Sequence, residues 1–266
     1  MKTVCSLDLK GKSLRNFTDR DENQDVTTYY VPFDVNSYDS IHDGMTDYSF
    51  NIYDSTYFPA FLSTRIGGTR VGQVNGMTFE YPSSPILAQP EALSVDKLCS
   101  IEKRAKLCQP ERQFYCQCTQ ILQLPSGKTV DIVLIDEGFG GNVSHTFHVH
   151  GYDVWIIGIG QFNRPVSKEN IIEMNDNGDL PRNKLDHNLR KDAFVVPNKG
   201  YVILRIHTDN IGYWLWEARS TGIGGDGPPM QFVMLVGGRE SLPTVPIDFP
   251  TCGDHKSPAS IFEDTD

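Results

Sequence analysis

The stretch NVSHTFHVHGYDVWIIGIG, residues 142–160, is the part of the chain on which the predicted fold depends. Its second half is apolar and rich in β-branched residues, which is typical of a strand. Because strand side chains alternate between two faces, His148 and His150 should share one face and His145 should lie on the other. Neutral imidazole is the commonest ligand of zinc and copper, so the pattern predicts two adjacent metal sites. Structural histidines that bind no metal are the alternative.

Further strands are predicted on both sides of this stretch, each bounded by turn residues. Pro32 suggests an edge position or a bulge for the first of them. No segment shows a convincing amphipathic helix, and the polar tract 163–192 is predicted to be a solvated excursion. The pattern predicts an all-β sandwich or Greek-key barrel with long loops. The predicted strands are 27–35, 49–53, 71–81, 128–136, two strands within 194–206 around an Asn-Lys-Gly turn, 213–216 and 230–236.

Composition excludes some classes of partner. The 266 residues carry a formal net charge of −10 and contain no block of basic residues. This argues against a nucleic acid and against an anionic membrane surface as partners. No apolar run reaches the roughly 18 residues that a membrane-spanning helix needs. The sequence therefore predicts an acidic protein without a transmembrane segment.

Six cysteines are present, and four of them lie between residues 99 and 118. A zinc knot is one interpretation, but the usual Cys-x2-Cys spacing is absent, so a disulfide-stapled loop is preferred. Two glycosylation sequons, at Asn16 and Asn142, agree with an extracellular location. Residues 1–20 contain no apolar signal segment, so we expect the chain to be the C-terminal part of a longer secreted protein. The disulfide candidates are Cys99, Cys108, Cys116, Cys118 and Cys252.

The stretch 145–160 resembles the third-domain copper strand of laccase-type multicopper oxidases, with its His-Pro-x-His-x-His-Gly pattern. The segments 196–205, 210–215 and 249–255 and the cysteine cluster fit the same family, and the likeness is greatest to arthropod laccases. The resemblance implies a plastocyanin-like cupredoxin domain at 27–245. Residues 1–26 would be a linker or the remnant of a preceding domain, and 246–266 a C-terminal tail. It also implies copper as the family's cofactor and upstream cupredoxin domains of the same longer chain as partners.

Carried over residue by residue, the resemblance makes His145 a type 1, His148 a type 2 and His150 a type 3 copper ligand. Thr146 stands where the family has proline, which is a minor departure. The serious departure follows Leu215, where the family continues with His-Cys-His. Here the chain has Glu217-Ala218-Arg219, and no cysteine occurs between positions 118 and 252. Met230 fits either the axial position of the type 1 site or a core residue.

A blue copper centre needs a thiolate and two imidazoles, and alanine replaces the thiolate here. Arginine stays protonated and cannot donate a lone pair, so Glu217 and Arg219 are predicted to pair with each other or with neighbours. We therefore predict a catalytically inactive extracellular structural or interaction protein with matrix or cuticle proteins as partners, and with its copper sites empty or partly occupied. The alternative is an oxidoreductase of diphenols or ferrous ion with residual activity in a longer chain. A faulty gene model at 217–219 is the third possibility, although the family pattern resumes smoothly at Met230.

Overall fold

The computed structural model describes residues 26–36, 71–93, 97–100, 116–138, 142–182, 190–219, 230–249 and 252. Three sequence predictions fall wholly or mainly outside these ranges: the N-terminal linker, the strand at 49–53 and most of the C-terminal tail. Asn16 and Cys108 also lie outside the described residues.

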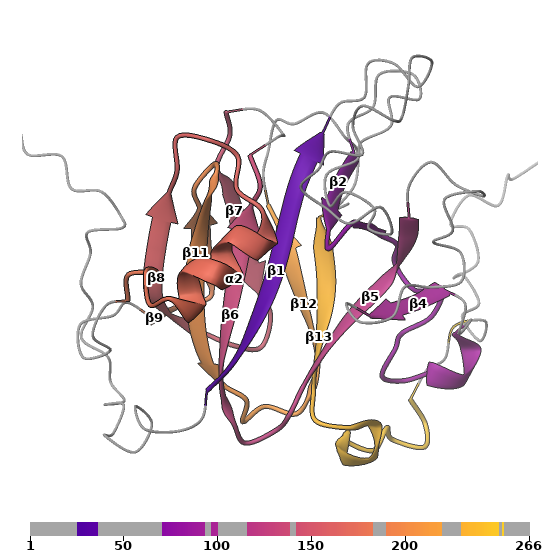
Figure 1. Cartoon of the computed structure of the whole chain (residues 1–266). Coiled ribbons are helices and arrows are strands. Elements are labelled where there is room, and N and C mark those ends of the chain that lie inside the picture. The colour runs from indigo at the N-terminus through magenta and orange to yellow at the C-terminus, as the bar shows by residue number, and fades with distance from the viewer. Residues whose placement is uncertain are drawn as a thin grey trace, which may run out of the picture.

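Strands make up most of the described chain, and Figure 1 shows them side by side. The nine-residue helix α2 (Lys168–Asp176) and the short 3-10 turns η2 (Pro90–Ala92) and η5 (Arg239–Ser241) complete it. The strands are β1 (Thr27–Asn36), β2 (Val71–Val74), β3 (Met77–Phe79), β4 (Leu98–Ser100), β5 (Cys116–Leu124), β6 (Thr129–Asp136), β7 (His145–Val149), β8 (Val154–Gln161), β9 (Arg190–Lys191), β10 (Ala193–Val196), β11 (Gly200–His207), β12 (Gly212–Ala218) and β13 (Gln231–Val236).

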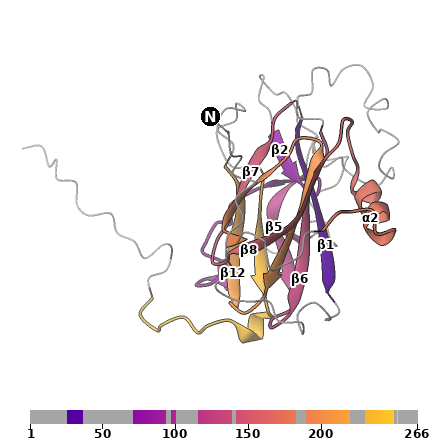
Figure 2. The same ribbon diagram turned by 90° about the vertical axis from the view of Figure 1, so that its left-hand side faces the viewer.

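The strands form two layers that join at β3 and β5. One layer has the order β2-β1-β6-β11-β8-β9, and the other has the order β10-β7-β12-β13-β5 with β4 also on β5. Neighbours such as β1 and β6, β7 and β12, or β5 and β13 are far apart in sequence, as Greek-key connections require. The predicted all-β, cupredoxin-like Greek-key sandwich is confirmed. Figure 2 shows β7 and β12 on one side and β1 and β6 on the other.

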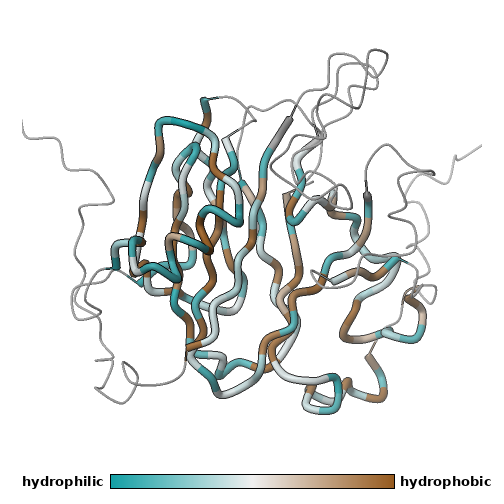
Figure 3. Tube along the Cα trace, in the orientation of Figure 1, coloured by the Kyte–Doolittle hydropathy of each residue, from teal (hydrophilic) through white to brown (hydrophobic). Residues whose placement is uncertain are grey.

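Alternating side chains of β6 enter two different cores, which explains its apolar run at 132–135. Val130, Ile132 and Leu134 belong to the cluster between the two layers. Val133 and Ile135 belong to a second cluster on the outer face of the sheet, which α2 covers. Figure 3 shows the apolar residues concentrated in these central strands and the polar ones at the loops. Burial on both faces makes β6 a rigid support for the strands on either side.

The helix α2 was not predicted, and the expectation of a solvated excursion over 163–192 was wrong for this segment. Ser167 caps the helix: its Oγ accepts a hydrogen bond from Asn170 N at 3.2 Å, and Asn170 Oδ1 accepts one from Ser167 N at 3.3 Å. Ile171 is fully buried against the sheet. The apolar face is only one turn deep, so tertiary packing rather than periodicity determines this helix.

The predicted strands around the Asn-Lys-Gly turn exist, but they do not pair as a hairpin. Lys199 has the left-handed φ of 51° that such a turn uses. However, β10 pairs with β7, whereas β11 pairs with β6 and β8. The turn therefore carries the chain from one layer to the other, although both strands bury apolar residues in the core between the layers.

The position of Pro32 in β1 is not a sheet edge, since β1 lies between β2 and β6. Phe33 is the first residue of β1 that has a register partner on β2. Pro32, one residue earlier, has a register partner only on β6. Proline is tolerated there because a missing N–H leaves no ladder bond unmade.

A disulfide joins Cys99 on β4 to Cys118 on β5. It uses two of the four clustered thiols, which supports the disulfide interpretation over the zinc knot. Cys116 contributes backbone to β5, and Cys252 has an exposed free thiol. Within the residues that the structure describes, no helix is long and apolar enough to span a membrane.

Candidate metal centre

Strand β7 separates the three histidines as its alternation predicts. His145 is buried, whereas His148 is partly exposed. His150 follows the last residue of β7, and its backbone N–H donates to Leu215 O at 2.9 Å, which ties it to β12. Gly151 has a φ of 69°, and its missing side chain leaves room for the Trp214 ring. The sharp turn after His150 therefore depends on glycine.

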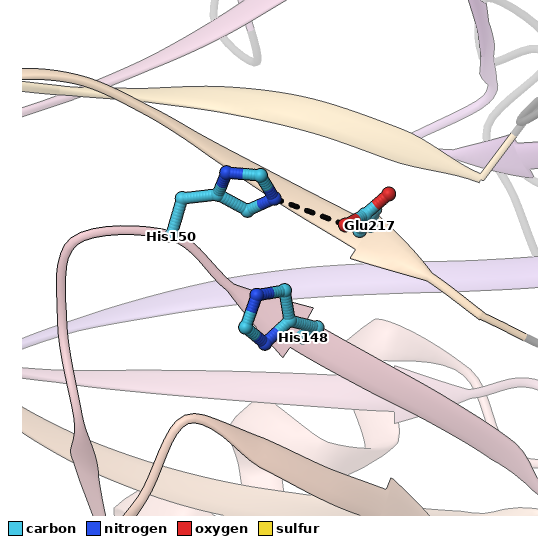
Figure 4. A group of neighbouring side chains, drawn as sticks. All are labelled: His148, His150 and Glu217. Atoms are coloured by element: carbon cyan, nitrogen blue, oxygen red, sulfur yellow. Dashed lines mark hydrogen bonds and ion pairs between the residues drawn. The ribbon is translucent and has the colours of Figure 1, made fainter.

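The outer face of β7 and β12 brings together His148, His150 and Glu217 (Figure 4). One ligand atom from each residue lies within 4.8 Å of the others. Glu217 is the register partner of His148 across the two strands. His150 Nε2 lies 3.0 Å from Glu217 Oε1, and the rings of His148 and His150 are 4.9 Å apart. The sequence alone had suggested that the remaining histidines could hold a zinc or copper ion loosely with the help of a carboxylate such as Glu217, and the structure brings these three side chains together.

The orientation of His148 is fixed by a backbone carbonyl. Its Nδ1 lies 3.1 Å from Asp192 O, which also accepts the N–H of Val149 at 2.9 Å. Because a carbonyl oxygen only accepts, Nδ1 carries the proton. The lone pair of neutral His148 is then on Nε2, the tautomer that a metal ligand on that atom requires.

Arg219 neutralises Glu217. The guanidinium donates to Glu217 Oε1 from Nε at 2.9 Å and from Nη2 at 2.6 Å, and it is 60% exposed. Burial alone raises the pKa of Glu217, but the hydrogen bonds from His150 and Arg219 outweigh burial and hold that pKa below its ordinary value. The carboxylate is therefore ionised at pH 7, and the predicted pairing of Glu217 with Arg219 is found.

The opposite face of β7 has a different chemistry. His145 is almost completely buried, with its ring edge-on to Phe33 at 5.5 Å. Burial lowers the pKa of His145 to about 4. Its Nε2 lies 3.7 Å from Asp136 Oδ2, which is equally buried. The imidazole is therefore neutral at pH 7, and this contact is not an ion pair.

Asp136, the carboxyl next to His145, belongs to a group of buried carboxyls that includes Asp34 and Glu137. Burial, reinforced by the negative charge of Asp34, raises the pKa of Asp136 to about 8, although the backbone N–H of Lys199 donates to its Oδ1 at 3.1 Å. Burial and Asp34 also raise the pKa of Glu137 well above its ordinary value. Sequence analysis missed this group. The signal was present in the acidic pair Asp136-Glu137 at the end of an apolar strand.

The surroundings of His145 do not fit a type 1 copper ion. Ala218 packs against the inner core, where it offers a methyl group. Met230 is buried in the same cluster, so the core interpretation of this residue is supported. The sequence supplies no thiolate between positions 118 and 252, and a protonated Asp136 offers no anionic charge at pH 7. Neither Ala218 nor Met230 therefore supplies the thiolate that a type 1 copper ion requires.

Comparison with known proteins identifies the family to which the chain is similar. The family model described as "Multicopper oxidase" matches residues 87–233, a range that includes β7 and β12. The chain is 29% identical over 154 residues to "Putative laccase-11" of Oryza sativa subsp. japonica, which covers 54% of this chain and 25% of the relative. It is 28% identical over 200 residues to "Laccase-22" of the same organism, covering 70% of this chain and 33% of the relative.

Solved structures show weaker similarity. The laccase from Botrytis aclada superposes with a TM-score of 0.46 at 14% identity, covering 83% of this chain and 30% of that one. The chain spans a quarter to a third of the length of the curated relatives above. The family match, in contrast, extends over more than half of the 266 residues. On that match, the protein belongs to the multicopper oxidase family.

Proposed function

We propose that residues 27–245 are a laccase-like third cupredoxin domain that has lost its oxidase chemistry and serves an extracellular structural or interaction role. One observation carries the proposal. On β12, Ala218 packs against the inner core and is the register partner of Phe147, while Glu217 and Arg219 pair on the outer face. Strand β12 therefore offers no thiolate, the ligand through which a type 1 copper ion would take up electrons.

The position among sister domains is part of the same proposal. Because the chain matches only a quarter to a third of its relatives, we infer that further cupredoxin domains adjoin it in a longer protein. Residues 1–26 would act as the linker and 246–266 as a tail. Resemblance of the copper strand to the third domain, and to arthropod laccases in particular, remains a prediction from the sequence.

The extracellular assignment rests on the disulfide and on Asn142. The bond between Cys99 and Cys118 suits an oxidising compartment. Asn142 is exposed, and its Oδ1 accepts a hydrogen bond from Asn198 Nδ2 at 2.9 Å. That bond leaves Nδ2 of Asn142 available for a glycan. Matrix or cuticle proteins are the partners that we propose.

Oxygen uptake tests this function. The purified protein in its natural full form, incubated with cupric ion and then assayed with a diphenol or with ferrous ion, should consume oxygen at the rate of the uncatalysed control. An active plant laccase in the same assay is the positive control. Copper-dependent turnover by the purified protein would support the alternative, an oxidase with residual activity, and would contradict the proposal.

A further inference from the structure

We propose that His148, His150 and Glu217 form a mononuclear zinc site. Such a site differs from the family's copper cluster in its carboxylate ligand and in holding a single ion without redox chemistry. The inference goes beyond the proposed inactivity and does not depend on it, since it concerns the outer face of β7 and β12, whereas oxidase loss is argued from the inner face.

Backbone hydrogen bonds between β7 and β12 position the three side chains without a metal ion. Glu217 faces His148 in the register of β12 and β7, and the N–H of His150 is bonded to Leu215 O on β12. On the far side, Arg219 N donates to Thr146 O at 2.7 Å, which extends the contact past Glu217. Ligands on paired strands lose little conformational freedom on binding, so the site is largely preorganised.

The donor chemistry suits zinc. Zinc accepts histidine nitrogens and carboxylate oxygens at roughly 2.0–2.2 Å, and two histidines with one glutamate are a known catalytic set that leaves a fourth position open. Ligand atoms around a tetrahedral ion of that size lie about 3.3 Å apart. His150 Nε2 and Glu217 Oε1 already meet this spacing at 3.0 Å. The ligand atom of His148 lies within 4.8 Å of those of His150 and Glu217, so small side-chain rotations would bring it to the spacing that a tetrahedral ion requires.

Two of the proposed ligands, His148 and Glu217, are held in place by hydrogen bonds to neighbouring groups. Asp192 O holds the Nδ1 proton of His148, and Arg219 holds the Glu217 carboxylate. Such hydrogen bonds fix ligand orientation in metal sites. The charge of Arg219 opposes the ion, but its guanidinium is mostly solvent-exposed, so water screens the repulsion. Copper(II) should compete for the same ligands, because it precedes zinc in affinity for nitrogen and oxygen donors.

Calorimetric titration of the metal-stripped 266-residue chain with zinc chloride tests the site. One equivalent of zinc should bind, and His148→Ala, His150→Ala and Glu217→Gln should each weaken binding by at least about tenfold. Glu217→His should retain binding, since it supplies a third imidazole. His207→Ala is the matched control: His207 lies on β11, with its Nδ1 3.4 Å from Thr129 Oγ1, and its loss should leave affinity unchanged.

Circular dichroism shows whether each variant is folded before titration. X-ray absorption spectroscopy at the zinc edge, measured on the zinc-loaded chain, should then report two imidazole nitrogens and a carboxylate oxygen as ligands. Failure to bind zinc stoichiometrically, or binding that survives both His150→Ala and Glu217→Gln, would overturn the site. Neither result would bear on oxygen uptake, so failure of this inference is distinguishable from failure of the proposed function.

Discussion

Replacing Trp216 by alanine should lower the free energy of unfolding by about 3–5 kcal/mol. Trp216 is fully buried on β12, stacked on Phe232 with ring centroids 5.4 Å apart and edge-on to Phe194 at 6.0 Å. Its Nε1 has no hydrogen-bond partner among the described residues. The loss is therefore one of apolar burial and of the cavity left behind, not of a polar contact. Urea denaturation followed by circular dichroism measures it.

Trp214, two residues earlier on the same strand, is the matched control. Its ring is partly exposed, and its Nε1 donates to Asn210 O at 2.9 Å. Trp214→Ala should therefore reduce stability by only about 1–2 kcal/mol. Equal losses for the two variants would show that the two layers are not held together by the core around Trp216.

Replacing Asp136 by asparagine should make the protein less sensitive to alkali. The folded-state pKa of Asp136 is about 8, against an ordinary value of 3.8, so the folded protein holds a proton that the unfolded chain has released. A raised folded pKa means that stability is lost as pH rises towards that pKa. Below pH 6.5 the lowered pKa of His145 acts in the opposite direction, so the effect is clearest above it.

The expected size follows from about 1.4 kcal/mol per pH unit for each proton released. Between pH 6.5 and 8, wild type should lose up to about 2 kcal/mol more stability than Asp136→Asn. Glu137 contributes to the remaining slope in both proteins, because its pKa is also raised. Asp248→Asn, at an exposed position, should behave as wild type. A pH profile of Asp136→Asn that coincides with wild type would mean that Asp136 is ionised in the folded state.

Alternation and turn residues were sufficient to predict most of the sheet. The strands β1, β6, β11, β12 and β13 lie where β-branched runs with turn boundaries predicted them. The two faces of β7 also followed from spacing alone, because the period of a strand is two whatever its partners are. Sheet membership did not follow. The turn at Lys199 suits a hairpin locally, and only tertiary packing sends β10 and β11 to different layers.

The site was predictable in its histidines and in the pairing of Glu217 with Arg219, but not in its remaining partners. Asp192 acts through its backbone carbonyl, which carries no side-chain signature. The contact of Asp136 with His145 joins the end of β6 to the start of β7, two strands that are not paired with each other, so strand alternation alone does not predict it. The helix α2 was missed because a single buried residue, Ile171, is too weak a periodic signal.

Visible absorption of the purified protein after incubation with cupric ion tests the central claim most directly. With alanine at position 218 and Glu217 paired with Arg219, any bound copper should have only nitrogen and oxygen ligands. The account therefore predicts the weak absorption of such a complex, lost in His150→Ala. An intense blue thiolate-to-copper band would contradict it.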